Sequence, residues 1–355
     1  FFKYTTQPPS TPEKIDFELI RIDNTNHTLL VMTDAHLING GDKSGKDDIA
    51  EAKSRLLPEL KGVVEKNKAE NRPLYFLFLG DIIEDLYWDS FGYPDYLNLM
   101  KELDVPIFHT MGNHEYSVNE SGDWDTAKDY KQYLGPTYYS FNLGKIHYVV
   151  LDNMICTNPG DGKSRSVIAQ MDNDQMAWLK QNLSYVNKNT PIVVALHVPV
   201  MKEIVKDGSA SYSIAMKGGE ELNALFEDYR EVYYLTGHTH VNSSSRIGNI
   251  LERNIAAVSG SWWFSTRPGL SERHISNDGS PGGYQLYTMI GDTVTWQYKG
   301  LGIDVNKQFR TYDRNQIHIT AERYCPNAPE EVKVKFDDTY AGKWGNSPMD
   351  KNSKP

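Results

Sequence analysis

The chain has 355 residues, of which 39% are hydrophobic and 24% charged, and its mean hydropathy is −0.55. These values are typical of a globular protein, and the absence of any run of about 18 apolar residues argues against a membrane-embedded chain. With 37 basic and 47 acidic residues the net charge is −10, which argues against a nucleic-acid backbone as the main partner.

The chain divides into three parts. Residues 1–16 contain adjacent prolines and no periodicity, so we expect an extended lead-in or the remnant of an upstream segment. Strand and helix patterns alternate through residues 17–302, which we predict to be one large domain. Residues 303–355 combine short β-like stretches with a polar tail, which predicts a partial β appendage.

The first half of the large domain alternates between strands and helices. Residues 27–34 and 73–81 are apolar runs that predict buried strands, and residues 47–69 predict a helix because Ile49, Leu56 and Leu60 recur at helical spacing. A short strand then leads into the polar turn GNHE. A short helix at 124–135 and a hairpin that turns at residues 142–145 follow.

The second half contains more strands. A helix is predicted at 172–186 with Asp172 as its N-cap, and another at 219–230. Strands are predicted at 190–199, 231–240, 249–263, 283–290 and 292–300, the last two joined by a turn at Gly291. This order predicts an α/β fold in which mixed parallel and antiparallel sheets are covered by helices.

Polar residues end five of the predicted strands. They are Asp34 and His36, Asp81, Asn113 and His114, His197, and His238 and His240. Because ligands gather at the carboxyl ends of strands in open α/β sheets, we expect these side chains to converge. Imidazole nitrogens mixed with carboxylate and amide oxygens suit Zn, Fe, Mn or Ni, and the set is too large for one ion. Two divalent ions that share a carboxylate account for the surplus.

The ordered motifs DAH, GD, GNHE, a histidine after an apolar strand, and GHTH resemble the calcineurin-like metallophosphoesterase superfamily. The resemblance covers residues 17–302 and implies a catalytic domain with two mixed β-sheets sandwiched between helices, followed by a small C-terminal β appendage. The motifs GSWW, NDGSPGGY and TWQYKG resemble a subgroup of exported bacterial members with extra β domains, which implies a periplasmic, cell-surface or secreted location.

The resemblance also implies a role for each strand-end residue. Asp34, His36 and His240 would hold the first metal ion. Asn113, His197 and His238 would hold the second. Asp81 would bridge the two ions, and His114 would face the leaving group.

The implied function is metal-dependent hydrolysis of a phosphoester by a water that the dinuclear centre activates. We expect a small-molecule substrate, either a phosphodiester such as a lipid head group or nucleotide conjugate, or a broad range of phosphoesters. A phosphomonoesterase, a non-catalytic surface binding module and a metallohydrolase of non-phosphate substrates, such as an amidase, are the alternatives.

Other polar and aromatic residues have more than one interpretation. Tyr87, Trp262, Trp263 and Tyr284 are candidates for a substrate-binding wall, although core packing is an equal alternative. We expect Glu84 and Asp85 to cap a turn or lie on the pocket rim, and Glu115 to orient the His114 loop without binding metal. The histidines outside the strand ends are predicted to be structural.

Overall fold

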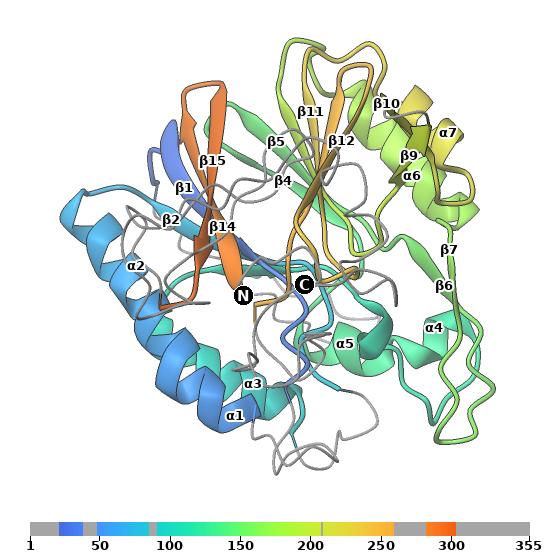
Figure 1. The fold of residues 1–355 in the computed structure, drawn as a ribbon, viewed down its shortest axis with the longest axis horizontal. Helices are drawn as coiled ribbons and strands as arrows, with labels where there is room; N and C mark the ends of the chain where they lie inside the picture. Colours follow the sequence, from blue (N-terminus) through green and yellow to red (C-terminus); the bar gives the residue numbers. More distant parts are fainter. Residues whose placement is uncertain (1–20, 38–47, 85–90, 207–208, 259–281, 303–355) are drawn as a thin grey trace, which may run out of the picture.

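The structure is a computed structural model that describes residues 21–37, 48–84, 91–206, 209–258 and 282–302 (Figure 1). Residues 1–20 and 303–355, which include the predicted lead-in and β appendage, lie outside the described residues. No helix in the described part of the chain is long and apolar enough to cross a membrane.

The first β-sheet has five strands in the order β15-β14-β1-β2-β3. Its strands are β1 (Asn26–Met32), β2 (Leu74–Phe78), β3 (Ile107–His109), β14 (Gly283–Ile290) and β15 (Thr293–Gly300). β1, β2 and β3 run parallel, whereas β14 and β15 form an antiparallel hairpin that pairs with β1. The parallel strands place their carboxyl ends at one edge of this mixed sheet.

The second β-sheet has six strands in the order β12-β13-β11-β8-β5-β4. Its strands are β4 (Tyr139–Leu143), β5 (Ile146–Val150), β8 (Ile192–Ala195), β11 (Val232–Thr236), β12 (Ser243–Ile247) and β13 (Ile250–Asn254). The four central strands are parallel, and β4 and β12 are antiparallel at the two edges. Both sheets are therefore mixed, as predicted.

The two sheets pack face to face through alternate residues of their strands. Leu29 and Val31 of β1 belong to the same buried cluster as Tyr148 of β5 and Val193 of β8. The intervening residues point to the outer faces, so Leu30 belongs to a different cluster. Strands buried on both faces read as continuous apolar runs, which is why the sequence pattern identified them.

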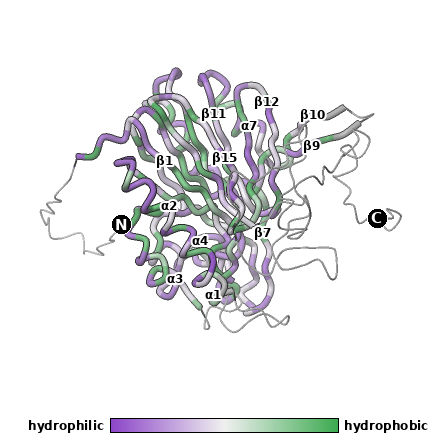
Figure 2. The backbone as a smooth tube through the Cα atoms, turned by 60° about the vertical axis from the view of Figure 1, so that its left-hand side comes forward, coloured by the Kyte–Doolittle hydropathy of each residue, from purple (hydrophilic) through white to green (hydrophobic). Residues whose placement is uncertain are grey.

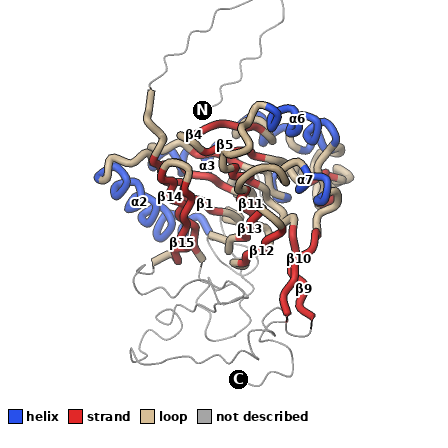
Figure 3. Tube along the Cα trace, turned by 90° about the horizontal axis from the view of Figure 1, so that it is seen from above, coloured by secondary structure: helices blue, strands red, loops and turns tan. Residues whose placement is uncertain are grey.

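Helices cover the outer faces of the sheets. α1 (Asp48–Glu51), α2 (Leu57–Ala69) and α3 (Tyr93–Met100) lie on the side of the first sheet, and α6 (Asn173–Ser184) and α7 (Gly219–Ala224) lie on the side of the second (Figure 1). Two short helices, α4 (Asp123–Thr126) and α5 (Lys128–Tyr133), lie near one end. Viewed from above, the red strands lie between blue helices (Figure 3), and hydrophobic stretches follow the strands (Figure 2). The predicted sandwich between helices is thus confirmed.

Several local predictions agree with the structure and others need correction. Asp172 caps α6 as predicted, its Oδ1 accepting a hydrogen bond of 2.8 Å from the Gln175 N–H. The predicted helix at 47–69 is divided, because a π-helical segment (Ala52–Leu56) joins α1 to α2. Pro58, in the first turn of α2, has no N–H to donate and crowds the preceding turn, which explains the irregularity.

Two hairpins were not predicted from the sequence. One is formed by β6 (Met154–Cys156) and β7 (Val167–Ala169), and the other by β9 (Met201–Lys206) and β10 (Ser209–Ile214). The β9–β10 hairpin extends away from the two sheets (Figure 3). Edge strand β12 was also missed, because its sequence SSSRI lacks the apolar alternation of a strand.

One buried carboxyl group fastens the β9–β10 hairpin to the second sheet. Glu252 on β13 is 2% exposed, and its Oε2 accepts hydrogen bonds from the backbone N–H groups of Val200 and Met201 at 2.9 and 3.0 Å. Burial raises the pKa of Glu252 to about 8, although the two N–H donors oppose the shift. In the folded protein Glu252 therefore keeps a proton that it releases in the unfolded chain near its ordinary pKa of 4.5.

We predict that Glu252→Gln removes a pH-dependent loss of stability. Because the folded-state pKa is raised, this group's contribution to the unfolding free energy falls as pH rises from 4.5 to about 8. The wild type should lose about 1 kcal/mol per pH unit relative to the variant across this window. Urea denaturation at pH 5, 6, 7 and 8 measures the difference, and parallel pH profiles would contradict the assignment.

Candidate metal centre

The strand ends of both sheets meet at one site. β1 leads to Asp34 and His36, and β2 leads to Asp81. A 3-10 turn (Asn113–Glu115) after β3 carries Asn113 and His114. From the second sheet, β8 leads to His197, and β11 leads to His238 and His240. The structure thus brings together all eight strand-end residues that the sequence singled out.

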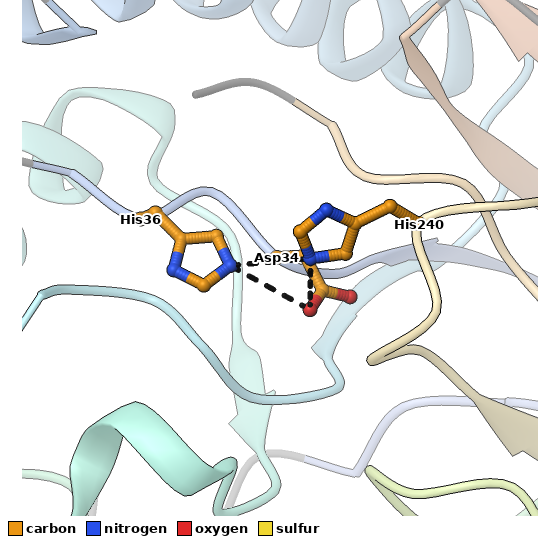
Figure 4. A group of neighbouring side chains, drawn as sticks. All are labelled: Asp34, His36 and His240. Carbon is orange, nitrogen blue, oxygen red and sulfur yellow. Dashed lines mark hydrogen bonds and ion pairs between the residues drawn. The ribbon is translucent and has the colours of Figure 1, made fainter. Parts of the chain in front are cut away.

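Asp34, His36 and His240 form what we call the first half-set (Figure 4). His240 Nε2 lies 3.1 Å from Asp34 Oδ1 and 3.3 Å from His36 Nε2. Asp34 and His36 are at most 2% exposed, and His240 is 8% exposed. Three donor atoms therefore face one another in a nearly closed space.

Asn113, His197 and His238 form the second half-set. Asn113 Oδ1 lies 3.1 Å from His197 Nε2 and 2.8 Å from His238 Nδ1. His197 is fully buried, whereas His238 is exposed. The second half-set is therefore the more open to solvent of the two.

Asp81 lies between the two half-sets. Its Oδ2 is 3.6 Å from His36 Nε2 of the first and 3.2 Å from His197 Nε2 of the second. Its other oxygen, Oδ1, accepts a hydrogen bond of 2.9 Å from the His114 backbone N–H. One carboxylate oxygen is thus placed where both half-sets can share it.

Most of these residues adopt a left-handed backbone conformation. The φ angles are 54° at Asp34, 44° at His36, 52° at Asp81, 67° at His238 and 59° at His240. Positive φ is uncommon for residues other than glycine and costs of order 1 kcal/mol or more at each position. Such a concentration of strained backbone is typical of a functional site.

Two glycines allow the segments to approach closely. A Cβ at Gly237 would lie 2.0 Å from Thr33 Oγ1 and 2.5 Å from Asp34 Oδ2. A Cβ at Gly112 would lie 2.3 Å from the Asp81 backbone nitrogen. The Gly in GHTH and the Gly in GNHE are therefore needed because no side chain fits at either position.

Hydrogen bonds to the backbone orient the metal-facing atoms. Asp34 Oδ2 accepts from the His238 N–H at 2.9 Å, which leaves Oδ1 facing the other donors. His197 Nδ1 donates to the Leu79 carbonyl oxygen at 2.7 Å, so Nε2 is the ring nitrogen that faces the centre. Fixing one ring nitrogen in this way is the usual means of orienting a metal-binding histidine.

Glu115 holds the two loops that carry Asp81 and Asn113. Its Oε2 accepts from the backbone N–H groups of Asp81 and Gly112, and its Oε1 from Ile82, each at 2.7 Å. Burial, followed by the Asp81 charge, raises the pKa of Glu115 to about 7. The carboxyl group faces the backbone, which agrees with an orienting role and not with metal binding.

Glu84 is not on the pocket rim, contrary to the expectation from the sequence. It is 2% exposed, and its Oε2 lies 2.7 Å from His114 Nδ1 and 3.7 Å from His36 Nδ1. Its Oε1 accepts a hydrogen bond from Arg165. The position of Glu84 three residues after Asp81 was a usable sequence signal, whereas nothing in the sequence singled out Arg165.

The charges of the centre determine its protonation. Burial alone lowers the pKa of His114, but Asp81 and then Glu84 outweigh this effect and raise it to about 9. The same competition, with Asp81 as the main charge, raises the pKa of His197 to about 10. Burial and the neighbouring His197 lower the pKa of His238 to about 4. Asp81 itself has a strongly lowered pKa, because its histidine neighbours outweigh its burial.

The donor atoms fit divalent transition-metal ions. Ligand atoms of Asp34, His36 and His240 all lie within 4.8 Å of one another, and the same is true of Asp81, His197 and His238. Imidazole nitrogens and carboxylate oxygens at this spacing suit Zn, Fe, Mn or Ni, which would take the place of the protons that the histidines otherwise bind. The metal roles assigned to individual residues stay predictions.

The predicted substrate-binding aromatic residues are not part of the described centre. Tyr87, Trp262 and Trp263 lie outside the described residues. Tyr284 on β14 is 1% exposed and donates a hydrogen bond of 3.0 Å to Glu59 of α2. The contacts of Tyr284 are those of a core residue, which favours the structural alternative.

Comparison with known proteins identifies related sequences and folds. The family model "Calcineurin-like phosphoesterase" matches residues 27–242, and "C terminal of Calcineurin-like phosphoesterase" matches residues 252–349. The human serine/threonine-protein phosphatase CPPED1 is 22% identical over 218 residues, which is 59% of this chain and 66% of that protein. The mouse manganese-dependent ADP-ribose/CDP-alcohol diphosphatase is 24% identical over 52% of this chain and 68% of its own length.

A solved structure supports the fold. The chain resembles the crystal structure of a dimetal phosphatase from Danio rerio with a TM-score of 0.51 and 15% sequence identity. The match covers 77% of this chain and 96% of the Danio rerio chain. At this identity the likeness extends to the arrangement of sheets and helices.

We predict that metal-reconstituted protein binds about two equivalents of Mn or Zn. His240→Ala should bind about one equivalent, because only the first half-set loses a donor. Binding of Mn or of Zn should raise the melting temperature of the wild type. Elemental analysis after gel filtration and differential scanning fluorimetry measure these effects. His147→Asn is a matched control, since His147 pairs with Asn142 and Asn182 away from the centre. Less than about one equivalent in the wild type would refute a dinuclear site.

We predict that Glu115→Ala destabilises the metal-free protein by about 3 kcal/mol or more, because three buried N–H groups lose their acceptor. The variant should also bind metal more weakly, since the loops that carry Asp81 and Asn113 are no longer fixed. Urea denaturation and metal titration measure the two effects. Glu120→Ala, which removes an exposed ion pair with Lys128, should change stability by at most about 0.5 kcal/mol. Equal losses in both variants would contradict the role of Glu115.

Proposed function

Since the chain belongs to the calcineurin-like phosphoesterase family, whose model matches residues 27–242, we propose that it catalyses metal-dependent hydrolysis of a phosphoester. The observation that supports this most directly is the position of Asp81. Its Oδ2 lies 3.6 Å from His36 in the first half-set and 3.2 Å from His197 in the second, as a shared ligand requires. Two adjacent cation sites are the arrangement that stabilises both sides of a phosphoryl displacement.

The residues of the two half-sets would hold the ions and the substrate phosphate in line. Ions held there would supply positive charge to the phosphoryl oxygens and would lower the pKa of water toward neutrality. The strained, hydrogen-bonded backbone fixes the donor atoms before substrate arrives, so little reorganisation is needed. Exposure of His238 indicates that substrate approaches from the side of the second half-set.

In this proposal His114 acts on the leaving group. Its Nδ1 faces Glu84 at 2.7 Å, and its Nε2 faces the centre, 3.9 Å from Asp81 Oδ2. With Nδ1 held by a carboxylate, Nε2 is the nitrogen that can give a proton to the departing oxygen. Within the described residues, His114 thus contributes a proton donor at the centre, whereas the half-sets contribute ligands.

Two classes of phosphoester are candidates for the substrate. The human relative is named a serine/threonine-protein phosphatase, and the mouse relative a manganese-dependent ADP-ribose/CDP-alcohol diphosphatase. We favour a small-molecule phosphodiester or a broad range of phosphoesters. A phosphomonoesterase is the second candidate.

We predict that metal-loaded wild type hydrolyses 4-nitrophenyl phosphate, bis(4-nitrophenyl) phosphate or both. His240→Ala should be slower by about 100-fold or more because an ion is lost, and His114→Ala by about 100-fold because the leaving group loses its proton donor. The ratio of rates on the two esters distinguishes monoesterase from diesterase.

The control is the wild type treated with a chelator and then reloaded with Mn or Zn, which should lose and regain activity. If metal-loaded wild type binds two ions but hydrolyses neither ester, a binding module or a hydrolase of non-phosphate substrates becomes the better explanation. Turnover of an amide in place of the phosphoesters would support an amidase.

A further inference from the structure

Arg165 reaches the centre from a loop that belongs to neither sheet. It lies between β6 and β7, and its guanidinium Nη2 is 2.5 Å from Glu84 Oε1. Its side chain is 19% exposed, whereas that of Glu84 is 2% exposed. We propose that Arg165 is a positioning residue that fixes Glu84 and, through it, the ring of His114.

Glu84 connects Arg165 to His114 through its two oxygens. Oε1 faces the guanidinium, and Oε2 lies 2.7 Å from His114 Nδ1 and 3.7 Å from His36 Nδ1. Two imidazoles therefore compete for one oxygen, and the nearer is His114. Because Arg165 holds the other oxygen, the carboxylate cannot rotate toward His36 without breaking a buried ion pair.

The loop that carries Arg165 is itself fixed. Asp161 Oδ1 accepts from the Lys163 and Ser164 N–H groups at 3.0 and 2.7 Å, which closes the turn. Asn158 Oδ1 accepts from the Ser166 N–H at 2.7 Å, next to Arg165. These bonds place the guanidinium through the backbone and not only through its contact with Glu84.

The same loop packs onto the segment that follows His114. Asn158 Nδ2 donates to the Ser117 carbonyl oxygen at 3.1 Å, and the Gly162 N–H donates to the Val118 carbonyl oxygen at 3.0 Å. The loop therefore holds the His114 segment in two ways, by the bonds from Asn158 and Gly162 and through the contact of Arg165 with Glu84. Together these contacts restrict the direction in which His114 Nε2 points.

The inference rests on the proposed function, because it concerns the step in which His114 acts. In that step a water oxygen bonds to phosphorus while the bond from phosphorus to the leaving oxygen breaks. The leaving oxygen takes the electron pair of that bond and a proton from His114 Nε2. The water gives a proton to solvent, and solvent then reprotonates His114. A poor leaving group needs this proton, whereas a good one departs without it.

The test compares phenyl and 2,4-dinitrophenyl esters of whichever class, mono- or diester, the metal-loaded wild type hydrolyses. Arg165→Gln should lower kcat about 10-fold or more on the phenyl ester and at most about twofold on the dinitrophenyl ester, with KM unchanged. Arg165→Lys should lie between wild type and Arg165→Gln on the phenyl ester, since lysine keeps the charge without the fork of donors. His114→Ala should show the same dependence on leaving group.

Lys163→Gln is the matched control, because it removes one exposed positive charge from the same loop. It should equal wild type on both esters. Equal losses of Arg165→Gln on the two esters, or a rise in KM alone, would overturn the proposal in favour of a structural or substrate-contact role. If Arg165→Gln does not fold, the same comparison with Arg165→Lys decides. Absence of turnover in metal-loaded wild type would instead refute the proposed function.

Discussion

The burial of four carboxyl groups around one point is the constraint on which the centre depends. Asp34, Asp81, Glu84 and Glu115 are each at most 4% exposed. Charges this close cannot all stay ionised in a dry interior without compensation. Glu115 has three backbone N–H donors, and Glu84 has Arg165, so these two are satisfied within the protein. The oxygens of Asp34 and Asp81 that face the half-sets are surrounded by imidazole nitrogens, whose positive charge holds the pKa of both carboxyl groups down, and bound metal ions would take the place of that charge.

The topology explains why such a cluster can exist. Parallel strands from two sheets end at the same place, and each chain segment must turn at once to leave the sheet. The left-handed conformation of Asp34, Asp81 and His238 makes these turns and aims the side chains inward. The cost of that backbone is met by the apolar contacts between the sheets and by bonds such as Asp34 N–H to the Gly80 carbonyl at 3.0 Å.

Much of this arrangement was predictable from local sequence. Apolar runs identified the central strands, and the polar residue after each run identified the donors, because strand ends in an α/β sheet share an edge. Glu84 was expected to cap a turn or lie on the pocket rim, since sequence spacing does not reveal which side of a turn is buried. Arg165 was missed because it lies in an irregular loop and because its partner, Glu84, is 81 positions away in the sequence. The exported location and the limits of the three predicted parts stay predictions.

The strand order of the first sheet has a consequence for where the smallest stable unit ends. Every donor of the two half-sets lies between residues 34 and 240, within the matched range 27–242. Yet β1, which leads to Asp34 and His36, is paired on one side by β14, whose residues are 283–290. A fragment that stopped after the last donor would contain a full set of ligands and expose an apolar, unpaired strand edge. Such an edge promotes association between chains, so the late hairpin protects the solubility of the part that carries the chemistry.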